Sequence, residues 1–442
     1  MNVLLVGGGG REHAIASALK RSSCNLYTAM KNKNPGIANL STDFILIDEK
    51  DTEQISNWAV RKKIDIAIIG PDPVLEAGIV DRLEAAGIKC ASPTASAARI
   101  ETSKIFMRNL LKKYNIEGNI DFKVFEAVEP LVEFLKNYKK KFVIKPEGLT
   151  GGKGVKVMGE DFNTVTEAID YAKEIFLNRI GGTSNILLEE LVEGEEFSLQ
   201  AFCDGTHLAF MPIVQDFKRA FENDEGPNTG GMGSYSMPDH LLPFISITDY
   251  EKAKSIMSSI AKALKTEHAE FKGILYGQFM ITKDGPKVIE INARFADPES
   301  INVLSILKTD MVKILKAIID GTLDRLPVEF ENKATVVKYI VPKGYGTKPA
   351  IGEPIHIDYQ AIQTSGALLY YAAVNEKDKT VYTTSSRSLA LVGVDNNIFR
   401  AENIVESAAK FVSGNIYMRH DIAKKEMFDK KMERLKKIFA GS

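Results

Sequence analysis

The segment FVIKPEGLTGGKGVK, from Phe142 to Lys156, is the most informative part of the sequence. An apolar strand expected over residues 142–144 leads to Lys145 and then into a loop rich in glycine and lysine, with Gly148, Gly151, Gly152, Lys153, Gly154 and Lys156. Glycines let backbone N–H groups approach an oxyanion closely, and lysines supply positive charge. Because Gly154 rather than Ser or Thr follows Lys153, the loop departs from the rigid phosphate-loop pattern. We interpret it as a flap that closes over a nucleotide; a surface hairpin without a ligand is the alternative.

The composition is that of an ordinary globular protein. The chain has 442 residues, of which 44% are hydrophobic and 26% charged, and this length predicts about three or four domains. The 57 basic and 58 acidic side chains nearly cancel, so binding to nucleic acid or to an anionic membrane is not indicated. Three cysteines in no metal-ligand spacing, together with the lack of an apolar run of about 18 residues, predict a cytoplasmic protein.

The N-terminus predicts a second anion site. An apolar strand, Val3–Val6, and four glycines, Gly7–Gly10, precede a helix that opens at Arg11. A helix N-terminus in this setting presents free N–H groups and the positive end of the helix dipole to an anion. The third glycine of the dinucleotide fingerprint falls at Glu12, and no acidic residue closes the next strand near Tyr27–Met30. We therefore favour a small phosphorylated substrate over NAD, with a turn that binds nothing as the alternative.

Strands and helices alternate through the first hundred residues. Strands are expected at Phe44–Ile47 and Ile64–Ile69, and helices at Thr52–Arg61 and Val74–Ala86. This alternation predicts a parallel sheet in a domain that closes near Ile100.

The middle of the chain predicts a small lid and a functional loop. From residue 121 to 191 the order is strand, helix, strand, glycine flap, strand, helix and strand, which predicts an α+β lid hinged at both ends. The acidic residues that follow, Glu193–Glu196, fit either a nucleotide-binding strand end or a solvated hairpin. The segment Gln215–Met232 has no periodic pattern, and we interpret it as a functional loop between two strands.

A second group of chemically active residues follows Lys287. Strand alternation puts Glu290 and Asn292 on one face, and their oxygen atoms suit Mg²⁺ carried on phosphates. The alternative is the solvated face of an ordinary strand. The charged residues Arg294 and Asp297 lie just after the end of this strand, and their clustering favours a functional site over a solvated face. Beyond residue 327 the pattern predicts a smaller α+β domain, and the tail 423–439 predicts a basic amphipathic helix that packs on its own protein.

Eight motifs occur in an order that resembles a known family. They are GGGGREHA at Gly7–Ala14, IGPDPVLEAGIVDRL at Ile69–Leu83, SKIFMR at Ser103–Arg108, IKPEGLTGGKGV at Ile144–Val155, EELVEGEE at Glu189–Glu196, QDFKR at Gln215–Arg219, GPNTGGMG at Gly226–Gly233 and EINARFADPE at Glu290–Glu299. Together they resemble the phosphoribosylamine–glycine ligases of the ATP-grasp superfamily, from Met1 to about Asp421. The sequence departs from the usual family residues at Phe217, Gln278, Ala293 and Ala296.

The resemblance implies a multidomain α/β and α+β protein with the ATP-grasp fold. It places a Rossmann-like parallel-sheet substrate domain at 1–101, a central ATP-grasp domain at 102–120 and 192–328, a lid at 121–191 and a C-terminal α+β domain at 329–442. The implied reaction joins glycine to 5-phosphoribosylamine through glycyl phosphate in purine biosynthesis. ATP is the implied co-substrate, with one or two Mg²⁺ or Mn²⁺ ions. The implied protein is a cytoplasmic monomer or homodimer with neither nucleic acid nor membrane as a partner.

The resemblance also assigns site residues. The catalytic set is Lys145, Asp216 and Arg294. The ATP set is Lys104, Lys145, Gly151, Gly152, Lys153, Gly154, Glu189, Glu190, Leu191, Val192 and Glu196, in which residues 189–192 would bind adenine. The substrate set is Gly8, Gly9, Arg11, Glu12, His13, Lys218, Arg219 and Asp297, and the metal ligands are Glu290 and Asn292.

These assignments require that Lys145 and Glu290 share one site. Rival functions are another ATP-grasp ligase or carboxylase, an NAD-dependent oxidoreductase, and a nucleotide sensor without activity.

Overall fold

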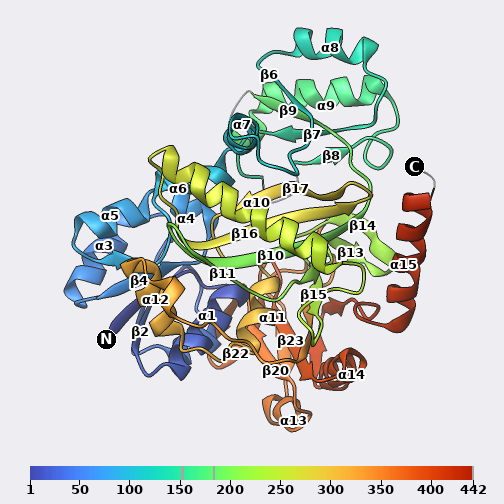
Figure 1. Ribbon diagram of the computed structural model, residues 1–442. Coiled ribbons are helices and arrows are strands. Elements are labelled where there is room, and N and C mark those ends of the chain that lie inside the picture. Colours follow the sequence, from blue (N-terminus) through green and yellow to red (C-terminus); the bar gives the residue numbers. More distant parts are fainter. Residues whose placement is uncertain (151–153, 183–184, 441–442) are drawn as a thin grey trace.

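The computed structural model describes residues 1–150, 154–182 and 185–440 (Figure 1). The first part is a five-stranded parallel sheet in the order β3-β2-β1-β4-β5, as predicted. Its strands are β1 (Asn2–Val6), β2 (Asn25–Met30), β3 (Asp43–Leu46), β4 (Ile66–Ile69) and β5 (Lys89–Cys90). Its helices are α1 (Gly10–Arg21), α2 (Pro35–Leu40), α3 (Thr52–Arg61), α4 (Asp72–Glu76), α5 (Ile79–Ala85) and α6 (Ala95–Thr102). The central strands β1 and β4 are short apolar runs and almost fully buried, as is typical of parallel sheets.

One predicted helix of this region is two helices. The expected helix Val74–Ala86 divides into α4 and α5 at Gly78, whose φ of 75° is left-handed. Glycine adopts this conformation without the steric cost that a Cβ brings, so the chain turns between the two helices.

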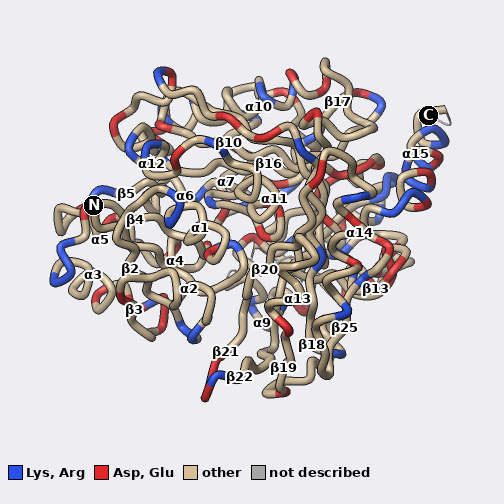
Figure 2. The backbone as a smooth tube through the Cα atoms, turned by 90° about the horizontal axis from the view of Figure 1, so that it is seen from below, with Lys and Arg blue, Asp and Glu red and all other residues tan. Residues whose placement is uncertain are grey.

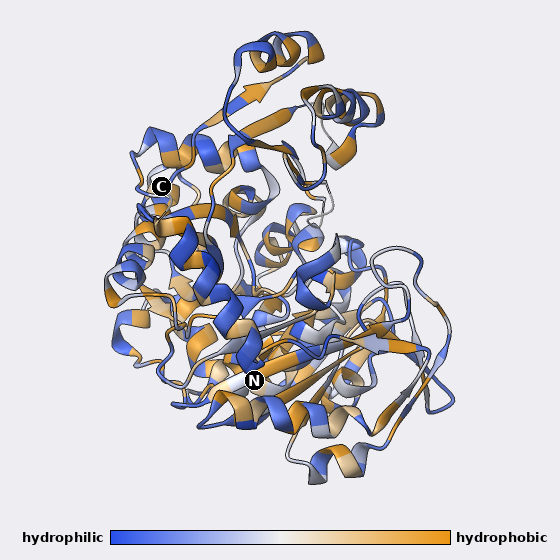
Figure 3. Cartoon of the chain, turned by 90° about the vertical axis from the view of Figure 1, so that its right-hand side faces the viewer, coloured by the Kyte–Doolittle hydropathy of each residue, from blue (hydrophilic) through white to orange (hydrophobic). Residues whose placement is uncertain are grey.

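The lid is a four-stranded antiparallel sheet in the order β6-β9-β7-β8, with two helices. Its elements follow the predicted order: β6 (Phe122–Phe125), α8 (Val128–Asn137), β7 (Phe142–Pro146), β8 (Lys156–Val157), α9 (Val165–Asn178) and β9 (Ile186–Glu190). The lid has a hydrophobic core of its own, which includes Phe142, Ile144 and Ile175. Figure 3 shows it as a separate lobe above the rest of the molecule.

The central part is built on a second antiparallel sheet, β11-β10-β16-β17. Its strands are β10 (Glu195–Asp204), β11 (Leu208–Phe210), β16 (Lys272–Thr282) and β17 (Gly285–Asn292). The helices of this part are α7 (Lys104–Lys113), α10 (Ile247–Thr266), α11 (Glu299–Ser305) and α12 (Met311–Asp320). Short 3-10 turns occur at Ile180–Gly182, Glu222–Asp224 and Leu323–Arg325.

The C-terminal part contains two sheets, with β12-β15-β18-β23-β20 and β25 in one and β21-β22-β19-β24 in the other. The strands of the first are β12 (Gln215–Asp216), β15 (Gly233–Ser236), β18 (Ala334–Pro342), β20 (Leu368–Tyr371), β23 (Leu389–Asp395) and β25 (Ile416–Met418). Those of the second are β19 (Pro354–Ile357), β21 (Val374–Lys377), β22 (Thr380–Thr383) and β24 (Val412–Gly414). The helices are α13 (Tyr359–Thr364), α14 (Ile398–Ala409) and α15 (Lys425–Ala440).

The segment Gln215–Met232 is more regular than its sequence indicates. It contributes β12 to the C-terminal sheet and then forms a hairpin of β13 (Arg219–Phe221) and β14 (Glu225–Asn228). These strands pair with near neighbours in the chain, such as Phe221 with Glu225, but they are too short to show a strand periodicity. Within the described ranges, none of the helices has both the length and the apolar content that a membrane span requires.

Candidate active site

Lys145 and Glu290 lie close together, as the predicted site requires. Lys145 extends from β7 of the lid, and its Nζ atom lies 3.5 Å from the carbonyl oxygen of Ile289 in β17. Glu290 is the next residue of that strand. Lys145 is nearly buried and its positive charge contributes to a lowered pKa of Glu290, where burial acts in the opposite direction. The lid therefore meets the central sheet at the predicted metal ligands.

Glu189 is a buried carboxylate between two cations. Its Oε1 atom is 2.6 Å from Nε of Arg108, and its Oε2 atom is 2.7 Å from Nζ of Lys145. Burial alone would raise the pKa of Glu189, but the two cations outweigh burial and lower the pKa to about 2. Arg108 also donates to the carbonyl of Ile289 at 3.2 Å. This arginine was not predicted, although it lies four residues after Lys104 on one face of α7, a spacing that marks neighbours on a helix.

The expected adenine-binding residues 189–192 connect the lid to the central sheet. The amide of Glu190 donates to the carbonyl of Asp121 at 2.9 Å, and that of Leu191 donates to the carbonyl of Lys141 at 3.0 Å. These two N–H groups are therefore used inside the protein. The side chains of Leu191 and Val192 are partly exposed. Contact between this segment and adenine stays a prediction.

Lys104 reaches the beginning of the glycine flap. Its Nζ atom donates to the carbonyl of Gly148 at 2.7 Å, and burial lowers the pKa of this lysine to about 8. At the other end of the flap, the hydroxyl of Tyr171 donates to the carbonyl of Gly154 at 2.7 Å. Three predicted phosphate-binding residues lie outside the described residues: Gly151, Gly152 and Lys153.

Glu196 and Lys218 form an ion pair beside β16. Lys218 Nζ is 2.8 Å from Glu196 Oε2 and 3.8 Å from Asp216 Oδ2. The amide of Gln278 donates to the same Glu196 oxygen at 2.6 Å. Burial lowers the pKa of Lys218, but Asp216 and Glu196 outweigh burial and raise it above its ordinary value. Lys218 is thus a permanent cation here. Gln278 was noted in the sequence only as a departure from the family pattern.

The oxygen atoms near Glu290 fit a divalent cation. Glu290 Oε1 accepts a hydrogen bond from Asn292 Nδ2 at 3.1 Å, so the two side chains lie on one face as predicted. Among the described residues, the buried Oδ1 atom of Asp216 has no hydrogen-bond partner. Burial raises the pKa of Asp216, and the charges of Glu196 and Glu290 act in the same direction. Carboxylate and amide oxygens are ligands that Mg²⁺ prefers, so Glu290 and Asn292 stay the predicted metal ligands.

Arg294 lies between the central sheet and the N-terminal part. Its Nη2 atom is 2.7 Å from Glu101 Oε1, and its Nε atom is 3.7 Å from Asp72 Oδ1. Burial raises the pKa of Glu101 to about 7, although Arg294 opposes this shift. Nε of Arg294 is buried and makes no hydrogen bond within the described parts of the chain. This donor therefore faces the Asp72 carboxylate without a hydrogen bond to it.

Asp297 is bound by residues of the C-terminal part. Its Oδ2 atom is 3.0 Å from Nη2 of Arg387, and its Oδ1 atom accepts from the hydroxyl of Tyr339. A Cβ on Gly10 would lie 2.2 Å from that hydroxyl oxygen, so the glycine turn packs directly against this group. Asp297 was predicted in one substrate set with the residues of the glycine turn, whereas neither Arg387 nor Tyr339 was predicted.

Glu12 changes the interpretation of the glycine turn. Its Oε2 atom accepts from the amide of Gly9 at 2.7 Å, and its Oε1 atom pairs with Nε of Arg11 at 2.6 Å. A Cβ on Gly70 would lie 2.0 Å from Glu12 Oε1, so glycine makes room for this carboxylate. The expected free N–H groups of the turn are therefore partly satisfied by the protein's own anion. Arg11 also donates to the carbonyl of Phe295 at 3.1 Å.

The remaining predicted substrate residues contact the protein itself. His13 is buried, and its Nδ1 atom accepts from the amide of Tyr371 at 2.8 Å; burial lowers the pKa of His13 to about 4, so the ring is neutral. The carbonyl of Gly8 accepts from Asn34 Nδ2 at 3.0 Å. Arg219 pairs with Glu160 of the lid. Substrate contacts by these residues stay predictions.

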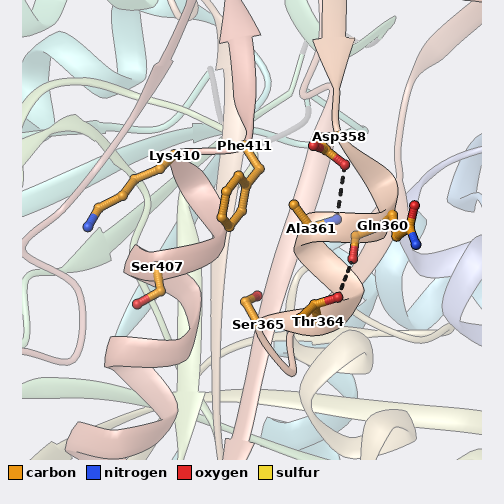
Figure 4. Close-up of a pocket in the computed structure, with 8 residues that line it drawn as sticks. All are labelled: Asp358, Gln360, Ala361, Thr364, Ser365, Ser407, Lys410 and Phe411. Atoms are coloured by element: carbon orange, nitrogen blue, oxygen red, sulfur yellow. Dashed lines mark hydrogen bonds between the residues drawn. The ribbon is translucent and has the colours of Figure 1, made fainter.

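One surface hollow lies outside this group of residues. Figure 4 shows it between α13 and α14, and none of the residues that line it belongs to the predicted site. Its lining residues are Asp358, Gln360, Ala361, Thr364, Ser365, Ser407, Lys410 and Phe411.

Comparisons with known proteins agree along the whole chain. Family models of phosphoribosylglycinamide synthetase match as the N domain over residues 1–101, the ATP-grasp (A) domain over 102–300 and the C domain over 335–425. The phosphoribosylamine–glycine ligase of Methanocaldococcus jannaschii is 52% identical over 99% of this chain and 100% of its own length.

Two solved structures are also similar. The crystal structure of phosphoribosylamine–glycine ligase from Thermotoga maritima is 26% identical, covers 95% of this chain and 100% of its own, and has a TM-score of 0.81. The biotin carboxylase domain of Hydrogenobacter thermophilus 2-oxoglutarate carboxylase, solved with MgADP and bicarbonate, is 16% identical over 99% of this chain and 98% of its own. Its TM-score of 0.75 indicates a shared fold alone.

Proposed function

The chain belongs to the phosphoribosylglycinamide synthetase family, and we propose that its active site is the group of residues around Lys145, Glu196 and Glu290. As a member of this family it is an ATP-dependent ligase of purine biosynthesis, which joins glycine to 5-phosphoribosylamine and forms glycinamide ribonucleotide, ADP and phosphate. The observation that carries the site proposal is the approach of Lys145 Nζ to the carbonyl oxygen of Ile289, at 3.5 Å. It puts a cation of the lid beside the acidic residues of the central sheet.

The chemistry explains why cations and acids must meet here. A carboxylate does not accept an amine, because oxide is too poor a leaving group. Transfer of the γ-phosphoryl group of ATP to glycine gives glycyl phosphate, from which the amine of phosphoribosylamine displaces phosphate. Lys145 and Lys104 hold phosphate oxygens in place, and the flap keeps water from the acyl phosphate.

Glu290 and Asn292 would hold Mg²⁺ or Mn²⁺, as one or two ions, with Asp216 as a further oxygen ligand. When bound, such an ion neutralises the charge of the phosphates. The ordered oxygen set and the unsatisfied Oδ1 atom of Asp216 support this assignment.

Arg294 and Arg387 are the proposed contacts for the anionic groups of glycine and phosphoribosylamine. Each has a carboxylate partner, Glu101 or Asp297, that fixes its orientation, and Nε of Arg294 is left as a donor. The proposed division into domains is the predicted one, with residues 121–191 as the lid. We also place the protein in the cytoplasm, supported by three buried cysteines that form no disulfide, as a monomer or homodimer.

The deciding experiment supplies the purified protein with ATP, Mg²⁺, glycine and phosphoribosylamine and identifies the product by mass spectrometry. We expect glycinamide ribonucleotide, with ADP release that requires both other substrates. ADP released equally without glycine and phosphoribosylamine would refute the function. A carboxylated product would identify a carboxylase of the same fold instead.

We expect the KM for ATP to rise with pH above about 8. The pKa of Lys104 is lowered to about 8, mainly by burial, so this lysine loses its charge in the free enzyme as the pH rises through that value. ATP binding favours the charged form, and above the pKa of the free enzyme the KM then rises up to about tenfold per pH unit. In a Lys104→Arg variant the side chain stays charged, so KM measured from pH 7 to 9.5 should be nearly constant. Equal slopes in the two proteins would contradict the assignment of Lys104.

A further inference from the structure

The C-terminal helix α15 runs along the side of the molecule beside the hairpin β13–β14 (Figure 1), and it contacts the chain segment that carries Asp216 and Lys218. Side chains of an extended segment alternate between two faces. Asp216 and Lys218 face Glu196 in the proposed nucleotide site. Phe217, between them, faces α15, because its ring centroid is 4.9 Å from Nζ of Lys431. One short segment therefore joins the site to the last helix.

Lys431 is the main charged contact of α15 with the central sheet. Its Nζ atom is 3.1 Å from Oε2 of Glu195, the residue beside Glu196 in β10. The side chain of Lys431 is 14% exposed and that of Glu195 is 3% exposed, so the pair is shielded from water. Arg434 adds a contact of 3.3 Å to the other carboxylate oxygen, but its side chain is 62% exposed. Water screens the Lys431–Glu195 pair less than the exposed Arg434 contact.

A side-chain amide connects this ion pair to the site. Nε2 of Gln215 approaches Glu195 Oε2 at 3.4 Å and donates to the carbonyl oxygen of Glu196 at 2.9 Å. The hydroxyl of Tyr235 donates to Oε1 of Gln215 at 2.8 Å, and the ring of Tyr235 contacts Phe428 of α15 at 5.0 Å between centroids. The helix thus contacts both chain segments that supply the Glu196–Lys218 pair.

We propose that Lys431 is a positioning residue for the nucleotide site, which holds β10 and the segment 215–218 so that Glu196 and Lys218 meet in the geometry that ATP requires. The proposal rests on the function proposed above. Helix α15 begins at Lys425, where the match to the family model ends, so that match assigns it no role. The basic residues along the helix are visible in Figure 2.

The test compares Lys431→Met with Lys436→Met, which removes an exposed lysine from the same helix. In Lys431→Met we expect the KM for ATP to rise about tenfold, since supporting contacts around a site typically matter by this factor or more, while kcat at saturating ATP changes much less. Lys436→Met should leave both values unchanged. Lys431→Arg restores the cation and should recover most of the ATP affinity.

Two outcomes would overturn the proposal. One is an equal KM in Lys431→Met and Lys436→Met. The other is a fall in thermal stability and in kcat with no change in the KM for ATP and no rescue by Lys431→Arg, which identifies a purely structural contact. Failure of the unsubstituted protein to form glycinamide ribonucleotide would instead refute the proposed function, so the two failures are distinguishable.

Discussion

Replacing Glu290 by Ala is expected to lower kcat by a factor of about 10³ or more while the protein still folds. The carboxylate of Glu290 is the proposed metal ligand on β17, and an alanine side chain supplies no oxygen atom in its place. The change removes charge stabilisation that the phosphoryl-transfer step needs, so the loss should appear in kcat even at saturating ATP and Mg²⁺.

The fold should survive because the cations near Glu290 have other partners. Lys145 pairs with Glu189 at 2.7 Å, and Lys218 pairs with Glu196 at 2.8 Å. Arg294 likewise pairs with Glu101 at 2.7 Å. Loss of the Glu290 carboxylate therefore leaves no buried cation alone, which is the usual cause of severe destabilisation.

The measurement pairs steady-state kinetics with a thermal melt. Glu225→Ala, which removes an exposed carboxylate on β14, is the matched control and should behave as the unsubstituted protein in both assays. A Glu290→Ala protein with kcat within about tenfold of the control would exclude this residue from the metal site.

Local sequence patterns predicted the elements that carry the site. The order of strands and helices in the lid follows from apolar runs separated by glycines, whereas the approach of Lys145 to Glu290 was implied by the family resemblance. The cap formed by Glu12 was also within reach, because an acidic residue at the third helical position after a glycine turn is a capping-box signal. The interpretation of the glycine turn as an anion site with free N–H groups did not take this cap by Glu12 into account.

Contacts between distant segments were beyond such patterns. Arg387 is 90 residues from its partner Asp297, and Lys431 is 236 residues from Glu195. Nothing around Arg387 or Lys431 distinguishes them from surface cations, because their burial arises only when separate sheets pack. The hairpin β13–β14 was missed for a different reason, because its strands are too short to show an alternating pattern. Pairing across domains depends on tertiary geometry, which local periodicity does not encode.

Replacing Arg108 by Met is expected to destabilise the protein by about 3–5 kcal/mol, the typical cost of removing one partner of a buried ion pair. Arg108 is fully buried, and its guanidinium holds Glu189 at 2.6 Å and the carbonyl of Ile289 at 3.2 Å. Without it, the carboxylate of Glu189 has only Lys145 as a cationic partner. Lys145 is then bound more tightly to Glu189 and is less available to phosphate, so kcat should fall as well.

The pH dependence of protein stability provides a second measurement of the effect of Arg108→Met. The pKa of Glu189 is lowered to about 2 in the folded protein, from an ordinary value of 4.5. A depressed carboxyl pKa stabilises the fold above pH 4.5, and this contribution is lost as the pH falls from 4.5 towards 2. In Arg108→Met the folded pKa of Glu189 is higher. The difference in urea midpoint between variant and unsubstituted protein should therefore be largest near neutral pH and shrink below pH 4.5.

The matched control is Lys112→Met, which removes an exposed cation one turn further along the same helix α7. A double variant, Arg108→Met with Glu189→Gln, removes the stranded charge as well as the arginine. It should lose less stability than the sum of the two single changes, because the residues belong to one hydrogen-bonded network. Equal urea midpoints for Arg108→Met and Lys112→Met, or strict additivity in the double variant, would show that Arg108 does not hold Glu189 in place. The approach of β7 to β17, which brings Lys145 to Glu290, would then depend on the hydrophobic packing of the lid and not on this buried ion pair.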